Sequence, residues 1–187
     1  MATIIRPILS WIKSLSEHQT HVEQHPEDYC PDNCPYCGKS DLRLYGCYYR
    51  VPDRESPSGE SFNPVKILRF ICQDEACGRT CSCLPACIPP HRWYQWESQE
   101  KVFSQLLSGD SIHQVSKSLT PARRTVARWW RWLNDQYPLF SHHILNRFHE
   151  DLGRYNSASS SFWSALFEQK SLMEGMVINI QSGVAIP

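Results

Sequence analysis

The chain has 187 residues, and its 19 lysines and arginines balance 19 aspartates and glutamates, so its formal net charge is zero. This length allows one or two domains, and a hydrophobic content of 41% is enough for a buried core. No apolar run approaches the roughly 20 residues that a transmembrane helix needs, so we expect no membrane protein. The balanced charge gives no general attraction to nucleic acid, and charge has to be examined segment by segment.

Residues 1–27 predict an amphipathic helix followed by a polar linker. Apolar side chains recur from Thr3 to about Ser16 on a broad helical face, and Pro7 places the regular start of the helix near Arg6. This face could dock on the chain's own domain or on another subunit, and both interpretations stay open. The linker contains three histidines that we expect to be solvated and not bound to metal, namely His18, His21 and His25.

Residues 28–90 contain two short cysteine pairs, each followed by glycine, in the segments CPYCG and CQDEACG. Two loops that each supply a pair of thiolates suit a tetrahedral site with four sulfur ligands. Gly38 and Gly78 allow the tight turns that point backbone N–H groups at the sulfurs. The second pair is spaced C-x4-C, which still lies within the usual ligand range. We therefore predict one structural zinc ion bound by Cys34, Cys37, Cys72 and Cys77.

Nine cysteines also allow other interpretations. A disulfide scaffold is disfavoured by the odd count and by an N-terminus without the pattern of a signal peptide. A redox CxxC site needs a thioredoxin-like βαβ context, which the sequence does not show. An iron–sulfur cluster also uses four cysteines, and spacing alone leaves it open. Three further cysteines are close enough in sequence to replace a ligand, namely Cys30, Cys81 and Cys83. Buried or reduced thiols are the plainer interpretation of these three and of Cys47 and Cys87.

The cysteine pairs enclose a predicted pair of strands. Residues 42–51 and 65–71 are rich in aromatic and β-branched side chains, and the loop between them contains three prolines. Residues 80–84 are a candidate for a third, short strand. This arrangement is typical of a zinc ribbon, a small antiparallel sheet that depends on its metal for much of its folding free energy.

Residues 91–140 predict a helix-turn-helix domain. We expect helices at residues 98–107, 111–118 and 121–137. Thr120 is a good N-cap for the long third helix, and Pro121 fits its first position. A short helix, a tight turn and a long helix form the arrangement in which the last helix enters the major groove of DNA.

The long helix is expected to have one apolar and one basic face. With about 100° between residues, the core face holds Ala122, Val126, Trp129, Trp130 and Leu133. The stretch from Lys117 to Arg131 has five basic residues and no acid, and arginine binds phosphate or guanine. A solvated basic face is the plainer alternative, but the capped helix start favours DNA. We predict DNA contacts from Lys117, Pro121, Arg123, Arg124, Thr125, Arg128 and Arg131.

The segments CPYCGKSDLRLYGCYYR and RFICQDEACGRTCSCLP, followed by this helical module, resemble the N-terminal DNA-binding part of insertion-sequence transposases. The resemblance covers residues 34–137 and implies the same four cysteine ligands. The GRT motif of that family matches Gly78, Arg79 and Thr80. The chain departs from the family pattern in a second cysteine pair that is two residues longer and in Cys81, which replaces an aromatic residue. The resemblance implies a zinc ribbon, DNA binding and a setting in a bacterial mobile element.

Residues 141–187 predict a helical tail, with helices at residues 142–152 and 162–170 and a strand in MVINIQSGVAIP. The catalytic domain of such transposases needs three separated acids and on the order of 100 residues or more. The tail is shorter than that, and the chain shows no hydrolase triad, P-loop or recombinase tyrosine motif. We therefore expect a protein that is not an enzyme.

The sequence as a whole predicts an α+β fold with a zinc ribbon, an all-α helix-turn-helix domain and a helical tail. The expected function is a Zn2+-containing, sequence-specific DNA-binding protein, an accessory or regulatory factor in transposition or recombination. A protein-interaction adaptor in a recombination complex and a transcriptional regulator are the alternatives. The expected partner is double-stranded DNA, with a recombinase or transposase and a second copy of the chain as further candidates. The expected location is the cytoplasm, at the nucleoid.

Overall fold

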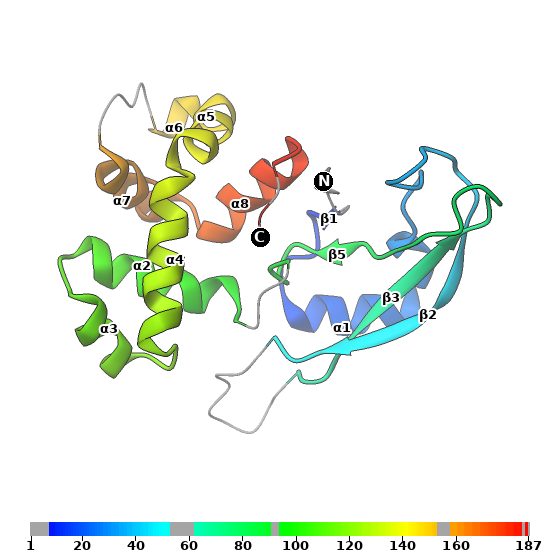
Figure 1. Cartoon of the computed structure of the whole chain (residues 1–187), viewed down its shortest axis with the longest axis horizontal. Coiled ribbons are helices and arrows are strands. Elements are labelled where there is room, and N and C mark those ends of the chain that lie inside the picture. The colour runs from blue at the N-terminus through cyan, green and yellow to red at the C-terminus, as the bar shows by residue number, and fades with distance from the viewer. Residues whose placement is uncertain (1–7, 53–61, 91–93, 153–157, 185, 187) are drawn as a thin grey trace. The chain divides into compact units, whose positions relative to one another are not determined.

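The computed structural model describes residues 8–52, 62–90, 94–152, 158–184 and 186 (Figure 1). In this part of the chain an α+β fold is present, with eight α-helices and a three-stranded antiparallel sheet. The chain divides into two compact units. We call Met1–Gln95 together with Gly183–Pro187 the N-terminal unit, and Trp96–Ser182 the helical unit.

The N-terminal unit contains all the strands of the described chain. Its elements are β1 (Ile8–Leu9), α1 (Leu15–Gln24), the 3-10 helix η1 (Pro26–Tyr29), β2 (Leu42–Arg50), β3 (Val65–Cys72), β4 (Thr80–Cys81) and β5 (Leu84–Pro85). The antiparallel sheet has the order β2-β3-β4, and β1 pairs with β5 in a separate parallel ladder. The strands that the sequence predicts at residues 42–51 and 65–71 are thus confirmed, and the short third one is β4.

The ladder between β2 and β3 sets the positions of the loops at its ends. Leu42 lies opposite Cys72, so the loop before β2 and the loop after β3 meet at one end of the sheet. The register shifts between Leu44 and Gly46, which makes Tyr45 the extra residue of a β-bulge. Beyond the bulge, Gly46 lies opposite Arg69.

The predicted N-terminal helix is wrong in position. Residues 3–7 lie outside the described part of the chain, whereas Ile8–Leu9 is a strand and the helix α1 begins only at Leu15. Ser14 caps this helix, because its hydroxyl accepts from the Glu17 N–H and the Glu17 carboxylate accepts from the Ser14 N–H. This capping box satisfies backbone donors that have no partner inside the helix, and so it fixes the helix start.

The core of the N-terminal unit lies between α1, β3 and the segment around β5. Its buried members come from all of these elements: Ile12, Leu15, Val22, Tyr29, Val65, Ile67, Leu68, Phe70, Cys81, Leu84, Cys87 and Ile88. The sequence predicts a thin ribbon that depends on its metal for much of its stability, whereas the structure adds the apolar packing of a helix and a buried segment to the sheet.

His18 is the largest departure from the sequence expectation in this unit. The sequence predicts it in a solvated linker, but it lies on α1 with none of its surface exposed. Its Nε2 donates to the Lys66 carbonyl at 2.9 Å, so Nδ1 accepts from the Tyr29 hydroxyl at 2.7 Å. Burial lowers the pKa of the His18 imidazole below its ordinary value of 6.5. The ring is thus held neutral and ties α1 to β3.

The buried His18 predicts acid lability of the N-terminal unit. The unfolded chain takes up a proton on His18 near pH 6.5, whereas the folded imidazole has a lower pKa. The contribution of His18 to the free energy of unfolding is therefore fully present above pH 6.5 and is lost as the pH falls below it. The protection factors of the amides in α1 and β3, measured by hydrogen exchange above and below pH 6.5, should show this loss. His18→Gln should reduce the difference between the two pH values. An unchanged difference in that variant would contradict the assignment.

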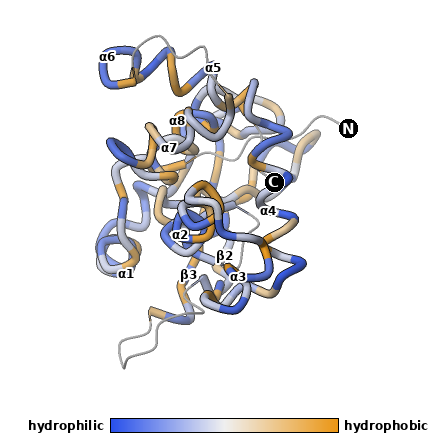
Figure 2. The backbone as a smooth tube through the Cα atoms, turned by 90° about the vertical axis from the view of Figure 1, so that its left-hand side faces the viewer, coloured by the Kyte–Doolittle hydropathy of each residue, from blue (hydrophilic) through white to orange (hydrophobic). Residues whose placement is uncertain are grey.

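The helical unit contains seven helices in the described residues. They are α2 (Trp96–Leu107), α3 (Ile112–Ser118), α4 (Arg123–Asp135), α5 (Tyr137–Arg147), α6 (His149–Leu152), α7 (Ser159–Gln169) and α8 (Leu172–Gln181). The three helices predicted between residues 98 and 137 are present as α2, α3 and α4. Hydrophilic and hydrophobic residues alternate around the turns of these helices (Figure 2), as expected for amphipathic helices around a core.

Several helix bounds in the helical unit differ from the prediction, and the predicted helix 142–152 is divided between α5 and α6. The start of α4 and the C-terminal segment differ most. The N-cap of α4 is Ala122, without a side-chain hydrogen bond, so Thr120 does not cap this helix. The strand predicted near the C-terminus is the helix α8. Ser171 and Glu174 form a capping box at its start, and the carboxylate of Glu100 on α2 accepts from the Leu172 N–H. These caps and the burial of its apolar side chains outweigh the β-branched residues that suggest a strand.

The tail helices belong to the core of the helical unit. α8 packs against α5 and α2, and α7 packs against α2. The fully buried side chains of this core include Phe103, Val126, Leu133, Phe140, Ile144, Phe162, Trp163, Leu166, Leu172 and Met176. In the described part of the chain, no helix has the length and apolar character that crossing a membrane requires.

Candidate functional site

Four cysteines meet where the loop before β2 and the loop after β3 come together. Cys34 and Cys37 lie on the first loop, Cys72 ends β3 and Cys77 precedes β4. All four Sγ atoms lie within 4.8 Å of one another. These are the four residues that the spacing of the cysteines predicts, and together they could hold a metal ion.

The distances between the sulfur atoms fit a single tetrahedral ion. The Sγ atoms of Cys34 and Cys77 are 3.8 Å apart, and those of Cys37 and Cys72 are 3.6 Å apart. An ion with metal–sulfur bonds of about 2.3 Å, the length typical of zinc, separates its sulfurs by about 3.8 Å. The donor set therefore has the size of a one-ion site.

The first cysteine loop is a tight turn closed by backbone hydrogen bonds. The Cys34 N–H donates to the Lys39 carbonyl at 2.7 Å, and the Gly38 N–H donates to the Cys34 carbonyl at 2.8 Å. Gly38 has φ +76°, in the left-handed region where a side chain would strain the backbone. The chain can thus reverse directly after Cys37 and leave both thiols on the same side.

The second cysteine loop makes the same turn with two extra residues. Here Asp74 supplies the acceptors, because its carbonyl accepts from the N–H groups of Cys77 and Gly78, each at 2.9 Å. Its carboxylate also accepts from the Ala76 N–H and forms an ion pair with Lys39 of the first loop. Gly78 again has a positive φ, +54°. Asp74 therefore explains how C-x4-C replaces the shorter spacing, and it clamps the two loops together.

The four thiols strongly influence one another's ionisation. At Cys34, burial raises the pKa, but the N–H groups of Tyr36 and Cys37 outweigh it and lower the pKa to about 7. At Cys72, the Asp74 N–H lowers the pKa, but burial and the other three thiols outweigh it and raise the pKa to about 12. One thiolate in the cluster thus opposes the ionisation of the next thiol, and the charge of a bound cation would remove this repulsion.

The other five cysteines lie outside this cluster. Cys30 is half-buried, Cys47 is exposed on β2, and three are buried, namely Cys81, Cys83 and Cys87. Burial raises the pKa of Cys81 to about 11 and that of Cys83 to about 12, which keeps both as neutral thiols. Among the described residues, only the four predicted ligands bring their sulfur atoms together, so Cys30, Cys81 and Cys83 do not replace any of them. All nine cysteines lie in the described residues, and none of them forms a disulfide bond.

The predicted basic face of α4 consists mostly of exposed side chains. The four arginines Arg123, Arg124, Arg128 and Arg131 are exposed, as is Lys117 on α3, and Thr125 is half-buried. Pro121 is buried, so it offers no surface for contact. On the opposite side of the helix Val126, Trp129 and Leu133 are almost completely buried. The predicted core face was wrong at Ala122, which is exposed, and at Trp130, which is half-buried.

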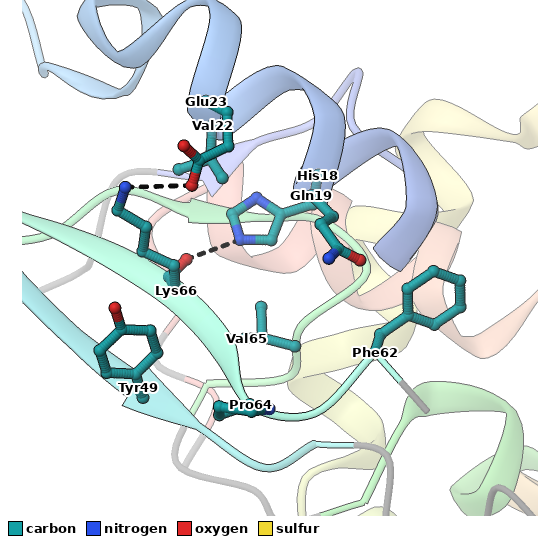
Figure 3. Close-up of a pocket in the computed structure, with 9 residues that line it drawn as sticks. All are labelled: His18, Gln19, Val22, Glu23, Tyr49, Phe62, Pro64, Val65 and Lys66. Carbon is teal, nitrogen blue, oxygen red and sulfur yellow. Dashed lines mark hydrogen bonds and ion pairs between the residues drawn. The ribbon is translucent and has the colours of Figure 1, made fainter. Parts of the chain in front are cut away.

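The N-terminal unit also contains a cavity of about 160 Å³ between α1 and β3 (Figure 3). Nine residues line it: His18, Gln19, Val22, Glu23, Tyr49, Phe62, Pro64, Val65 and Lys66. His18 uses both ring nitrogens in the hydrogen bonds described above, and Lys66 Nζ pairs with Glu23 at 3.1 Å. Ligand sites need polar groups that converge on the cavity. Because these groups are engaged with one another, we assign the cavity no function.

A family model described as a domain of unknown function (DUF6431) matches residues 34–129, which is half of the chain. The chain belongs to the DUF6431 family. The match of this DUF6431 protein begins at the ligand candidate Cys34 and ends within α4, so it spans the whole cysteine cluster, α2 and α3. Comparison with curated proteins and with solved structures finds no match.

Proposed function

We propose that this chain is a zinc-stabilised protein that binds double-stranded DNA through α4 and catalyses no reaction on it. The observation that supports this best is the basic face of α4. Arg124, Arg128 and Arg131 are exposed, and the opposite side of the same helix is buried in the core. Positions separated by four and three residues lie on one side of a helix, so these three guanidinium groups share a face. Such a face suits a phosphate backbone and guanine edges.

The packing of the three helices around this face supports the interpretation as a helix-turn-helix. α3 packs against both α2 and α4, and residues 119–122 form a four-residue connection between α3 and α4. The Ser118 hydroxyl donates to Gln105 Oε1 at 2.9 Å, which links the end of α3 to α2. Val115 and Val126 are fully buried. A short helix fixed in this way would support α4 as the helix that reads the major groove.

Zinc is the metal that best suits the cysteine cluster. Four thiolates form a soft, closed donor set, which is typical of structural zinc. An iron–sulfur cluster would hold the cysteines farther apart, because they bind different irons. When bound, the ion would fix the two loops relative to each other. The resemblance to transposase DNA-binding regions further supports a role as an accessory or regulatory factor of a mobile element.

The test measures DNA binding of arginine variants. DNA selected from a random pool by the purified chain supplies the duplex probe. On this probe Arg124→Ala and Arg128→Ala should each weaken binding by about 1–3 kcal/mol and relax base preference. Arg131→Ala, further along α4, should weaken binding to all DNA sequences similarly and flatten the dependence of binding on salt. Arg147→Ala is the matched control, because it removes an exposed arginine of α5 in the same unit.

Two results would overturn this proposal. One is a selection that enriches no sequence and recovers no duplex above background. The other is wild-type affinity in folded Arg124→Ala and Arg128→Ala variants. Either result would favour a protein-interaction adaptor, in which the sheet and not α4 makes the functional contact.

A further inference from the structure

One face of the three-stranded sheet holds an arginine stacked on a tyrosine at the bulge of β2. The guanidinium carbon of Arg69 lies 5.8 Å from the centre of the Tyr45 ring. Gly46, which lies opposite Arg69, has no side chain to fill this space. Arg69 Nη2 also donates to the Thr80 hydroxyl at 3.0 Å, so β4 holds the guanidinium in place. Tyr45 itself is 60% exposed.

A second arginine–tyrosine pair comes from the cysteine loops and is linked to the first pair through Thr80. The guanidinium carbon of Arg79 lies 5.1 Å from the centre of the Tyr36 ring. Tyr36 lies between Cys34 and Cys37, and its hydroxyl donates to the Thr80 carbonyl at 3.3 Å. Both pairs thus meet at Thr80, and the metal-binding loops position the second pair.

A third arginine extends the same face. Arg43 pairs across the sheet with Ile71, which in turn pairs with Thr80, so these three residues form one row on one side. The Arg43 side chain is 72% exposed, and within the described part of the chain its ion pair is a long one, to Asp41 at 4.0 Å. We call Tyr36, Arg43, Tyr45, Arg69, Arg79 and Thr80 the ribbon face.

We propose that the ribbon face is a second nucleic-acid site that binds single-stranded DNA. Three guanidinium groups give it a positive charge that complements a phosphate backbone. Two tyrosine rings, each steadied by an arginine, can stack on unpaired bases, which a duplex keeps stacked on one another. This site goes beyond the duplex contact of α4, and the choice of DNA instead of RNA rests on the proposed function.

The site can be tested with oligothymidylate, which has little structure of its own. The probe is fluorescently labelled, and anisotropy is measured with the full metal-loaded chain. Tyr45→Ala should weaken binding by about 5- to 150-fold, the loss of one base–aromatic stack. Tyr45→Phe keeps the ring and should bind like the wild type. Arg79→Ala should weaken binding and flatten its dependence on salt, because it removes a phosphate contact.

The duplex probe separates this site from that of α4. Tyr45→Ala should leave duplex binding unchanged, whereas Arg124→Ala should weaken duplex binding and leave oligothymidylate binding unchanged. The proposal is overturned if folded Tyr45→Ala and Arg79→Ala variants bind oligothymidylate like the wild type. It is also overturned if oligouridylate binds more tightly than oligothymidylate, since the surface would then select RNA. Neither result would affect duplex binding through α4, so the two proposals fail independently.

Discussion

Replacing Cys37 by serine should abolish stoichiometric metal binding and release the two cysteine loops. Structural zinc contributes an apparent binding free energy of about 10–16 kcal/mol, and much of it is lost when one thiolate of four is replaced by a serine hydroxyl. Cys37 is exposed, so its replacement removes little packing. A large loss of stability would therefore come from the loss of a metal ligand and not from a cavity in the core.

Metal content and amide hydrogen exchange together measure this effect. The wild type should contain about one zinc per chain, the ratio of a closed four-cysteine site. In Cys37→Ser, exchange should rise in the loops around Gly38 and Gly78, while β3 beside α1 stays protected by its apolar core. Cys47→Ser is the matched control, because Cys47 is an exposed cysteine outside the cluster. Full protection of both loops in a metal-free chain would contradict the assignment of a metal site. Absorption bands typical of iron would show that the bound metal is iron and not zinc.

Truncating Trp129 to alanine should unfold the helical unit under mild conditions. The side chain is 1% exposed, and deleting a buried tryptophan of this kind costs about 3–5 kcal/mol. That is a large part of the stability of a small domain. Urea unfolding of the variant should show a lower midpoint, and duplex DNA binding should be lost together with the fold of α4.

Trp130 supplies a control on the same helix. It is less buried than Trp129, so Trp130→Ala should cost less than Trp129→Ala. The sequence pattern instead places Trp130 in the core face. Equal unfolding midpoints for the two variants would show that Trp129 is not the central side chain of this core.

The cysteine cluster and the central helices were predictable because their signals are local. Two cysteine pairs, each followed by glycine, predict two tight loops, and the strands between the pairs bring those loops together. The prediction missed Asp74, although an aspartate inside the longer pair is a sequence signal for an extra turn. The stacked ribbon face was also missed, because a bulge that shifts Tyr45 next to Arg69 depends on pairing with a distant strand.

The starts of α1 and α8, which the predictions missed, had a signal in the sequence that the apolar pattern concealed. Ser14 followed by Glu17, and Ser171 followed by Glu174, are capping boxes, and both mark the observed helix starts. The burial of His18 had no such signal. Its partner Lys66 lies 48 residues further along the chain, and only the packing of α1 on β3 brings the two together.

The assignment of Gly183–Pro187 to the N-terminal unit makes the helical unit an insertion within it. During synthesis the strands of the sheet leave the ribosome first, then all of α2 to α8, and only afterwards Val184 and Ile186, which are buried. Domains usually fold as units while the chain emerges. The inserted helices can therefore complete their own core while the surrounding unit still lacks these two side chains. The speed of translation through residues 96–182 would then set how long the N-terminal unit lacks these two buried side chains.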